Sequence, residues 1–195
     1  SDPSQGYFAV AGSASFDLGV RERGVALRSG YGSFGTFQQL GLWAPEGAPD
    51  ETFGAVQVRR SNGFGDNRGS LSGSAIFQVA TPRNGGWQLR GIGFLSAARA
   101  DIAGVVRDDD VQSGRLDLYD AYPYATARQQ NAANTRLMAG VFATRRFDSG
   151  ANAEFGVFAG ADLFRTQMNF TGFLQESRTL EDVAGRGDLI EQRNR

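Results

Sequence analysis

Apolar and polar positions alternate strictly between Ala153 and Leu163. Every odd-numbered residue of this stretch is apolar: Ala153, Phe155, Val157, Ala159, Ala161 and Leu163. The even-numbered positions mix charge, glycine and one ring: Glu154, Gly156, Phe158, Gly160 and Asp162. A period of two over this length predicts a β-strand with one apolar and one more polar face. The run exceeds the ~5–6 residues usual in soluble strands and matches the roughly 9–11 that cross a bilayer at a tilt, so its apolar face contacts either a protein core or lipid.

Similar strand-like runs fill most of the chain after Arg23. Alternation and the turn residues between the runs predict strands at about 25–31, 36–45, 52–61, 71–81, 86–98, 136–147 and 153–167. The connection from Pro82 to Gly85 is tight, and its Asn84–Gly85 pair is a strong hairpin signal. The sequence therefore predicts an all-β, antiparallel, up-and-down arrangement of about seven strands.

The connections alternate in length past the opening pair of strands. The second, fourth and sixth are tight, whereas extended loops are predicted near 61–69, 99–135 and 168–195. An up-and-down sheet places alternate connections at opposite ends, so the long loops would share one end. Outer-membrane barrels have this asymmetry, with short periplasmic turns and longer external loops, which favours a transmembrane β-barrel. Trp43 and Trp87 lie next to tight turns and are candidates for an interfacial aromatic belt, or for ordinary packing at strand ends.

Composition removes several classes of protein. Mean hydropathy is -0.34 and no apolar run approaches the ~20 residues of a membrane-spanning helix, which excludes a helical membrane protein but not a barrel. The 20 basic residues against 21 acidic ones argue against nucleic acid bound through a net basic field. The chain has no His and no Cys, so His-based triads, Cys nucleophiles, disulfides and the usual zinc sites are excluded. No acidic pair lies in a recognisable catalytic setting, and we predict neither enzymatic activity nor a cofactor or metal.

Four motifs, taken in order, carry a resemblance to a known family. They are Ala9–Leu18 (AVAGSASFDL), Gly30–Thr36 (GYGSFGT), Asn62–Arg68 (NGFGDNR) and Asn169–Gly172 (NFTG). The first resembles the last plug strands of a TonB-dependent outer-membrane receptor, the second its first barrel hairpin, the third the loop after the third strand, and the fourth the exit of a later strand. The resemblance implies that residues 1–23 form the end of the plug domain and the plug-to-barrel connection. Residues 24–195 would then form the N-terminal part of the barrel.

The resemblance implies active uptake across the bacterial outer membrane. The cargo would be a scarce nutrient, such as a siderophore–metal chelate, cobalamin or an oligosaccharide, that external loops capture before the plug is displaced. The expected partners are outer-membrane lipid, the plug and remaining barrel strands of the same receptor, the nutrient ligand, and a TonB-type energy-coupling protein reached through an upstream segment. The ending from Glu191 to Arg195 resembles an external loop about to enter another strand, so the chain is expected to be a piece of a larger receptor.

The stretch from Leu116 to Tyr124 (LDLYDAYPY) is the most binding-like part of the chain. It combines stackable rings and carboxylates within a long loop: Asp117, Tyr119, Asp120, Tyr122 and Tyr124. Loops on a rigid scaffold often carry function, which makes these residues ligand-binding candidates. The alternative is that the rings pack the loop against the mouth of the barrel.

Charged residues on the predicted polar faces form a second candidate set. Arg90, Glu154 and Asp162 would line the passage or contact the plug, or else form structural salt bridges. The run Asp108–Asp110 lacks the ligand spacing of a calcium loop and predicts a solvated loop.

Two other classes of protein remain open at this point. A small stand-alone outer-membrane barrel with a structural or adhesive role is one, since about eight strands suffice to close a barrel. A soluble β-sandwich binding domain of lectin-like character is the other, with the long alternating strand packed on a second sheet. An enzyme that uses paired carboxylates is the weakest alternative.

Overall fold

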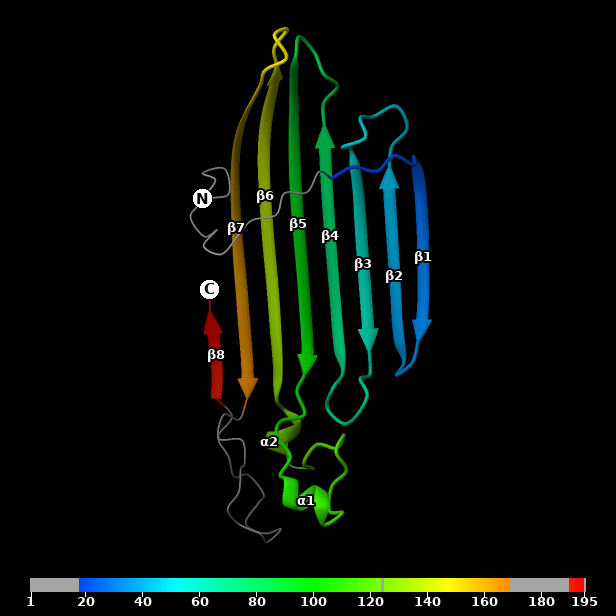
Figure 1. Cartoon of the computed structure of the whole chain (residues 1–195), viewed down its shortest axis with the longest axis vertical. Helices are drawn as coiled ribbons and strands as arrows, with labels where there is room; N and C mark the ends of the chain where they lie inside the picture. Colours follow the sequence, from blue (N-terminus) through cyan, green and yellow to red (C-terminus); the bar gives the residue numbers. More distant parts are fainter. Residues whose placement is uncertain (1–17, 124, 169–189, 195) are drawn as a thin grey trace.

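In the computed structural model, which describes residues 18–123, 125–168 and 190–194, the chain forms one antiparallel sheet (Figure 1). Eight strands lie side by side in sequence order, each hydrogen-bonded to the next. Their bounds are β1 Gly24–Gly32, β2 Thr36–Ala44, β3 Phe53–Ser61, β4 Ser70–Ala80, β5 Trp87–Asp101, β6 Asn131–Arg146, β7 Asn152–Met168 and β8 Ile190–Asn194. The predicted all-β, up-and-down arrangement is confirmed. The sheet does not close on itself, and β1 and β8 are its edges.

Each of the seven predicted runs coincides with one of β1 to β7, but two loop boundaries are wrong. The loop predicted at 99–135 spans only 102–130, because β5 continues to Asp101 and β6 begins at Asn131. The two extensions pair with each other residue by residue, which satisfies their backbone N–H and C=O groups although their side chains show no clear alternation. The loop predicted at 168–195 contains β8, which pairs with the end of β7, so the sheet has eight strands rather than about seven.

Two of the motifs behind the family resemblance fall largely or wholly outside the described residues. They are the plug-like segment, of which only Leu18 is described, and the segment 169–172. The two hairpin and loop motifs at 30–36 and 62–68 are described, and both lie at connections of the sheet.

Successive connections alternate between the two ends of the sheet (Figure 1). The tight-turn end, at the top of Figure 1, carries 45–52, 81–86 and 147–151. The loop end, at the bottom, carries the first hairpin at 33–35 and the longer connections 62–69 and 102–130, the last of which contains α1 (Asp108–Gln112) and α2 (Ala125–Arg128). The predicted difference in length holds between 102–130 and the turns 81–86 and 147–151, whereas 45–52 and 62–69 each have eight residues. Neither of these short helices in the described part of the chain has the length and apolar character needed to span a membrane.

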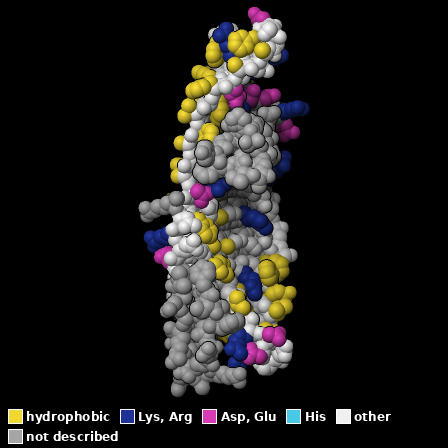
Figure 2. Space-filling model, turned by 60° about the vertical axis from the view of Figure 1, so that its left-hand side comes forward, with side chains coloured by type: hydrophobic (Ala, Val, Ile, Leu, Met, Phe, Trp, Pro, Cys, Tyr) yellow, Lys and Arg dark blue, Asp and Glu magenta, His cyan; other side chains and the backbone are white. Residues whose placement is uncertain are grey.

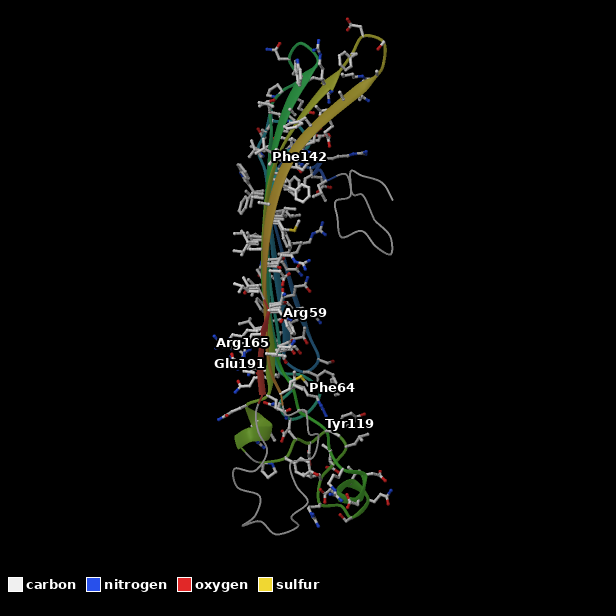
Figure 3. The ribbon with its side chains drawn as sticks, turned by 90° about the vertical axis from the view of Figure 1, so that its left-hand side faces the viewer. Arg59, Phe64, Tyr119, Phe142, Arg165 and Glu191 are labelled. Atoms are coloured by element: carbon white, nitrogen blue, oxygen red, sulfur yellow. The ribbon has the colours of Figure 1, made fainter. Side chains whose placement is uncertain are left out.

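Strand register gives the sheet two unlike faces, because successive side chains of a strand point to opposite sides. The apolar face carries exposed large hydrophobic side chains from β1 to β7: Val25, Leu27, Tyr31, Phe37, Trp43, Val56, Val58, Leu71, Phe77, Val79, Trp87, Leu89, Leu95, Leu137, Val141, Phe155, Val157 and Leu163. The polar face carries Arg59, Arg90, Arg136, Glu154 and Asp162 among other polar residues and several rings. Figure 3 shows the sheet edge-on, with Arg59 and Phe142 on the polar face and Arg165 and Glu191 on the apolar one.

The apolar face has no covering layer among the described residues. Val25 and Leu27 are 73% exposed and Phe155 is 72% exposed. Figure 2 shows the contrast in the upper half of the molecule, where hydrophobic side chains follow the left-hand profile and charged ones lie on the right. The buried apolar residues lie instead at the two ends of the sheet: Ala44, Phe53, Ala80, Ala103, Ala121 and Ala127. Soluble monomers rarely expose a continuous apolar surface of this extent, so this face belongs against lipid or another protein surface.

Candidate functional site

Three exposed rings from three different connections meet at the loop end of the sheet. Phe34 lies in the first hairpin, Phe64 in the connection 62–69, and Tyr119 in the connection 102–130. The ring centroids of Phe34 and Phe64 are 6.5 Å apart and those of Phe64 and Tyr119 are 5.7 Å apart, both edge-to-face. The three residues are 59%, 57% and 55% exposed. Figure 3 shows Phe64 and Tyr119 on the same side of the sheet as the polar face, and we call the three rings the aromatic platform.

Phe34 is held in a backbone conformation that bulky residues rarely adopt. Its φ is 58° and that of Gly35 is 62°, and the Thr36 N–H donates to the Ser33 carbonyl oxygen at 3.1 Å. Positive φ angles at both central residues of a hairpin turn are typical of Asn-Gly, Asp-Gly or Gly-Gly. A left-handed conformation costs a residue with a Cβ roughly 1–2 kcal/mol. Backbone strain of this kind is concentrated at functional sites, which makes the Phe34 ring a candidate functional group.

Close backbone contacts fix Phe64 and Tyr119 relative to each other. The Asp66 N–H donates to the Tyr119 carbonyl oxygen at 3.0 Å, and a Cβ added at Gly65 would lie 2.2 Å from that same oxygen. Only glycine fits at position 65 at this spacing. The Arg68 guanidinium lies over the Phe64 ring, 5.1 Å from its centroid, and adds a cation–π contact.

Asn67 ties the connection 62–69 to the connection 102–130. Its side-chain Nδ2 donates to the carbonyl oxygen of Ile102 at 2.6 Å and lies 3.4 Å from those of Ala127 and Gln130. Its φ of 50° is one that Asn tolerates better than most residues. The Arg128–Asp66 ion pair at 3.2 Å adds a second link between the two connections. The aromatic platform therefore rests on loops that brace one another.

Tyr122 anchors the long connection from inside. Its hydroxyl donates to the Asp110 carboxylate, which is 6% exposed and also forms an ion pair of 2.7 Å with Arg115. Burial, and secondarily the hydrogen bond to Asp110, raises the pKa of Tyr122 to about 12. This ring therefore packs the loop, while Tyr119 of the same stretch points to the aromatic platform.

The other predicted loop residues do not join the platform. Asp117 and Asp120 form a local turn in which the Asp117 N–H donates to the Asp120 carboxylate at 2.8 Å, while Tyr124 lies outside the described residues. In the neighbouring acidic run, hydrogen bonds from Arg107 hold the pKa of the Asp109 carboxyl at about 2. Within the described ranges no three acidic side chains are grouped so that they could hold a metal ion.

The three predicted interior residues, Arg90, Glu154 and Asp162, all lie on the polar face. Arg90 lies 3.9 Å from Glu154, and Asp162 accepts hydrogen bonds from Arg136 at 2.7 Å and from Asn134 at 2.9 Å. The structure thus brings Arg90 and Glu154 together and gives Asp162 different partners. Both clusters are partly exposed to solvent on a face that also carries rings.

Phe142 organises the polar face around Arg90. The Arg90 guanidinium lies 5.0 Å from the Phe142 ring centroid. The same ring lies over its cross-strand partner Gly156, where an added Cβ would come within 2.4 Å of it. Glycine at position 156 therefore provides the space that lets the ring lie flat beside Arg90.

Sequence reasoning missed Phe34, Phe64, Phe142 and Arg136 as site residues. Phe34 and Phe64 each stand next to glycine in a predicted connection (GSFGT and NGFGD), which is a usable signal for a ring displayed on a turn. Phe142 and Arg136 carry no local signal, because their importance comes from cross-strand partners.

Comparison of the chain with protein-family models, with curated proteins and with solved structures finds no match.

Proposed function

We propose that the chain is part of an outer-membrane β-barrel receptor of the TonB-dependent type, which takes up a scarce nutrient actively. The apolar face would contact lipid, the polar face would line the barrel interior, and the loop end would point outward. In this proposal residues 1–23 belong to the end of a plug, and further strands would complete the barrel. A TonB-type energy-coupling protein would supply the work that displaces the plug.

The single observation that carries the proposal is where charge lies on the apolar face. One register row crosses all eight strands near the loop end: Tyr31, Phe37, Arg60, Leu71, Arg99, Ala133, Arg165 and Arg193. We call this row the margin row. Between the margin row and the tight-turn end, the only charged residue on the apolar face of the described strands is Arg145. Arg145 lies 5.3 Å from the Trp87 ring centroid. Arginine and aromatic side chains therefore flank a band that has no charge.

The width of the uncharged band suits a bilayer. In β5 it runs from Arg99 to Trp87, about 40 Å along the strand at roughly 3.3 Å per residue. A strand tilted by about 35–45° would span roughly 30 Å of membrane, which is the thickness of the hydrocarbon core. Interfacial aromatic and cationic side chains at both margins are typical of membrane proteins. A β-sandwich has no reason to keep this spacing.

The aromatic platform supports the receptor part of the proposal. Three exposed rings at the loop end offer stacking surfaces for a chelate, a corrin or a sugar ring. The loops that hold them are braced by Asn67 and Arg128, as a preorganised capture surface requires. The polar face with its ion pairs would continue from this surface into the barrel.

Membrane residence is the first test. The full gene product that contains this chain should fractionate with outer membranes, resist extraction by urea, and migrate differently on a gel before and after boiling. A protein that melts cooperatively in plain buffer without detergent would contradict the proposal and favour the soluble sandwich.

Transport is the second test. Cells that depend on the receptor should lose energised uptake when Phe64→Ala and Tyr119→Ala are combined, while the matched surface change Leu118→Ala should not affect uptake. Residence in the membrane with no uptake that depends on the energy-coupling system would favour the stand-alone structural or adhesive barrel.

A further inference from the structure

A cleft of about 590 Å³ lies in the margin row at the loop ends of β3, β4 and β5. Arg60, Arg68 and Arg99 line it together with Asp101, Leu71 and short polar residues of the connection 62–69. Arg60 and Arg99 flank Leu71 in register, so their side chains leave the sheet on the apolar face on either side of it. Three arginines against one aspartate give the cleft a net formal charge of +2.

The arginines of this cleft are poorly compensated by the protein itself. Arg60 has no side-chain hydrogen bond or ion pair within residues 18–123, 125–168 and 190–194. The Nε of Arg68 is buried with no hydrogen-bond partner in the same part of the chain. Asp101 lies 3.6 Å from Arg99 and compensates the charge of only one of the three arginines. Arg60 and Arg99 are exposed, whereas the Nε of Arg68 is buried without an acceptor, which is costly and indicates an anion that the protein does not supply.

The surface beside the cleft is apolar, and many of its side chains are small. In the direction of the tight-turn end, the next register rows on the same face hold Val58, Gly73 and Ala97, and then Val56, Ala75 and Leu95. Further along β5, a Cβ added at Gly91 or Gly93 would meet nothing within 4 Å. A positive cleft continuous with an open apolar lane is complementary to an amphiphile with an anionic head and long tails.

We propose that this cleft binds the phosphate group of a lipid headgroup in the outer leaflet, with the acyl chains lying on the apolar face of β3 to β5. The inference rests on the proposed membrane-facing role of that face and adds a specific lipid site to it. Arg60 and Arg99 would each offer two parallel N–H donors to phosphate oxygens, a geometry that lysine cannot provide. The second arginine pair of the margin row is less available, because Glu191 already lies 2.8 Å from Arg193 and 3.8 Å from Arg165.

The test measures lipid retained by the full gene product in neutral detergent, using native mass spectrometry. The probe is lipid A with both phosphates, compared with the same lipid stripped of phosphate and with inorganic phosphate alone. The test variant is Arg60→Gln combined with Arg99→Gln. The matched control is Arg28→Gln combined with Arg59→Gln, which removes the same charge from the polar face, where Figure 3 places Arg59.

The proposal expects phosphorylated lipid A to be retained by the parent protein and by the control variant, and to bind at least about tenfold more weakly to the test variant. Equal loss in both variants, or equal retention of the dephosphorylated lipid, would overturn the proposal. Binding of inorganic phosphate as tight as that of the lipid would also overturn it, because the acyl chains would then contribute nothing.

Failure of this inference differs from failure of the proposed function. If all variants remain urea-resistant in the membrane and show boiling-dependent migration, but the test and control variants retain lipid equally, only the lipid site is wrong. If the parent protein itself folds in plain buffer and never enters the membrane, the proposed function and the lipid site both fall.

Discussion

The two faces of the sheet place their charges differently along the strands. On the polar face, charged side chains occur from Arg59 near the loop end to Arg146 near the tight-turn end, with Arg90 and Arg136 between them. On the apolar face of the described strands they occur only at the margins: in the margin row, at Asp101 and Glu191 beyond it toward the loop end, and at Arg145 near the tight-turn end. Both faces also carry rings and glycines, so apolarity alone separates them poorly. The position of charge along the strand is the property that separates the two faces, and the proposed contact with lipid rests on it.

The largest expected effect comes from putting the same charge on adjacent residues of one strand. Ala75 lies in the middle of the apolar face of β4, and Ser74 lies beside it on the polar face. In the proposed membrane arrangement this residue faces the bilayer centre, where an arginine costs about 2–4 kcal/mol, so Ala75→Arg should lower the free energy of unfolding by that amount. Ser74→Arg, opposite Gln57 and Ser96, should cost less than about 1 kcal/mol. Urea unfolding in lipid vesicles measures both, and equal costs would break the distinction between the faces.

A second comparison uses glycine on each face. Gly156→Ala on the polar face should cost about 1–3 kcal/mol, because the new Cβ would displace the Phe142 ring and end its contact with Arg90. Gly91→Ala on the apolar face should stay within about 0.5 kcal/mol of the parent protein, since its Cβ meets no atom within 4 Å. The same unfolding measurement separates them, and a neutral Gly156→Ala would show that Phe142 has another position available.

The strained turn at the loop end gives a smaller effect of opposite sign. Phe34→Asn should raise the free energy of unfolding by about 1 kcal/mol, because Asn adopts a positive φ more readily. Phe64→Ala removes a ring of the same platform without relieving strain, so it should lower the free energy of unfolding. Stabilisation by Phe34→Asn combined with reduced ligand capture would show that the ring is kept for binding. Destabilisation by Phe34→Asn would mean that the ring contact with Phe64 outweighs the strain.

The smallest effect is expected at the ion pair of the polar face. Glu154→Gln should change the free energy of unfolding by no more than about 1 kcal/mol, since the Arg90–Glu154 pair is 3.9 Å long and Glu154 is half exposed. The Thr144 hydroxyl lies 3.2 Å from Glu154 and can donate to the glutamine side-chain oxygen as well. A loss well above this range would indicate that the polar face excludes water more strongly than its exposure suggests.

The strands were predictable because alternation is a local property of the chain. All seven predicted runs coincide with strands, and the long alternating run is β7, the longest strand of the described part. The last residues of β5, the first residues of β6 and the whole of β8 were not predictable in this way, because Arg99, Ala100 and the polar residues of β8 become strand only through a neighbouring strand. Pairing overrides the weak local preference there.

The candidate site was predictable only in part, for a similar reason. Tyr119 joins the aromatic platform as a binding candidate should, whereas Tyr122 turns inward to Asp110. The sequence of the loop offers no way to tell these two rings apart. Likewise, the faces of Arg90, Glu154 and Asp162 follow from period two, but the choice of Arg136 as the partner of Asp162 depends on register.

The margin row also limits how the chain can change in length. Its eight residues lie side by side only because each strand has a fixed number of residues between its turn and the row. Deleting one residue between Trp87 and Arg99 would move Arg99 to the other face unless a bulge absorbed the change. Insertions and deletions should therefore be strongly selected against inside β3 to β7, and be tolerated best in the part of the connection 102–130 that does not contact the connection 62–69. Among natural variants of this protein, differences in length should therefore be concentrated at the loop end of the sheet.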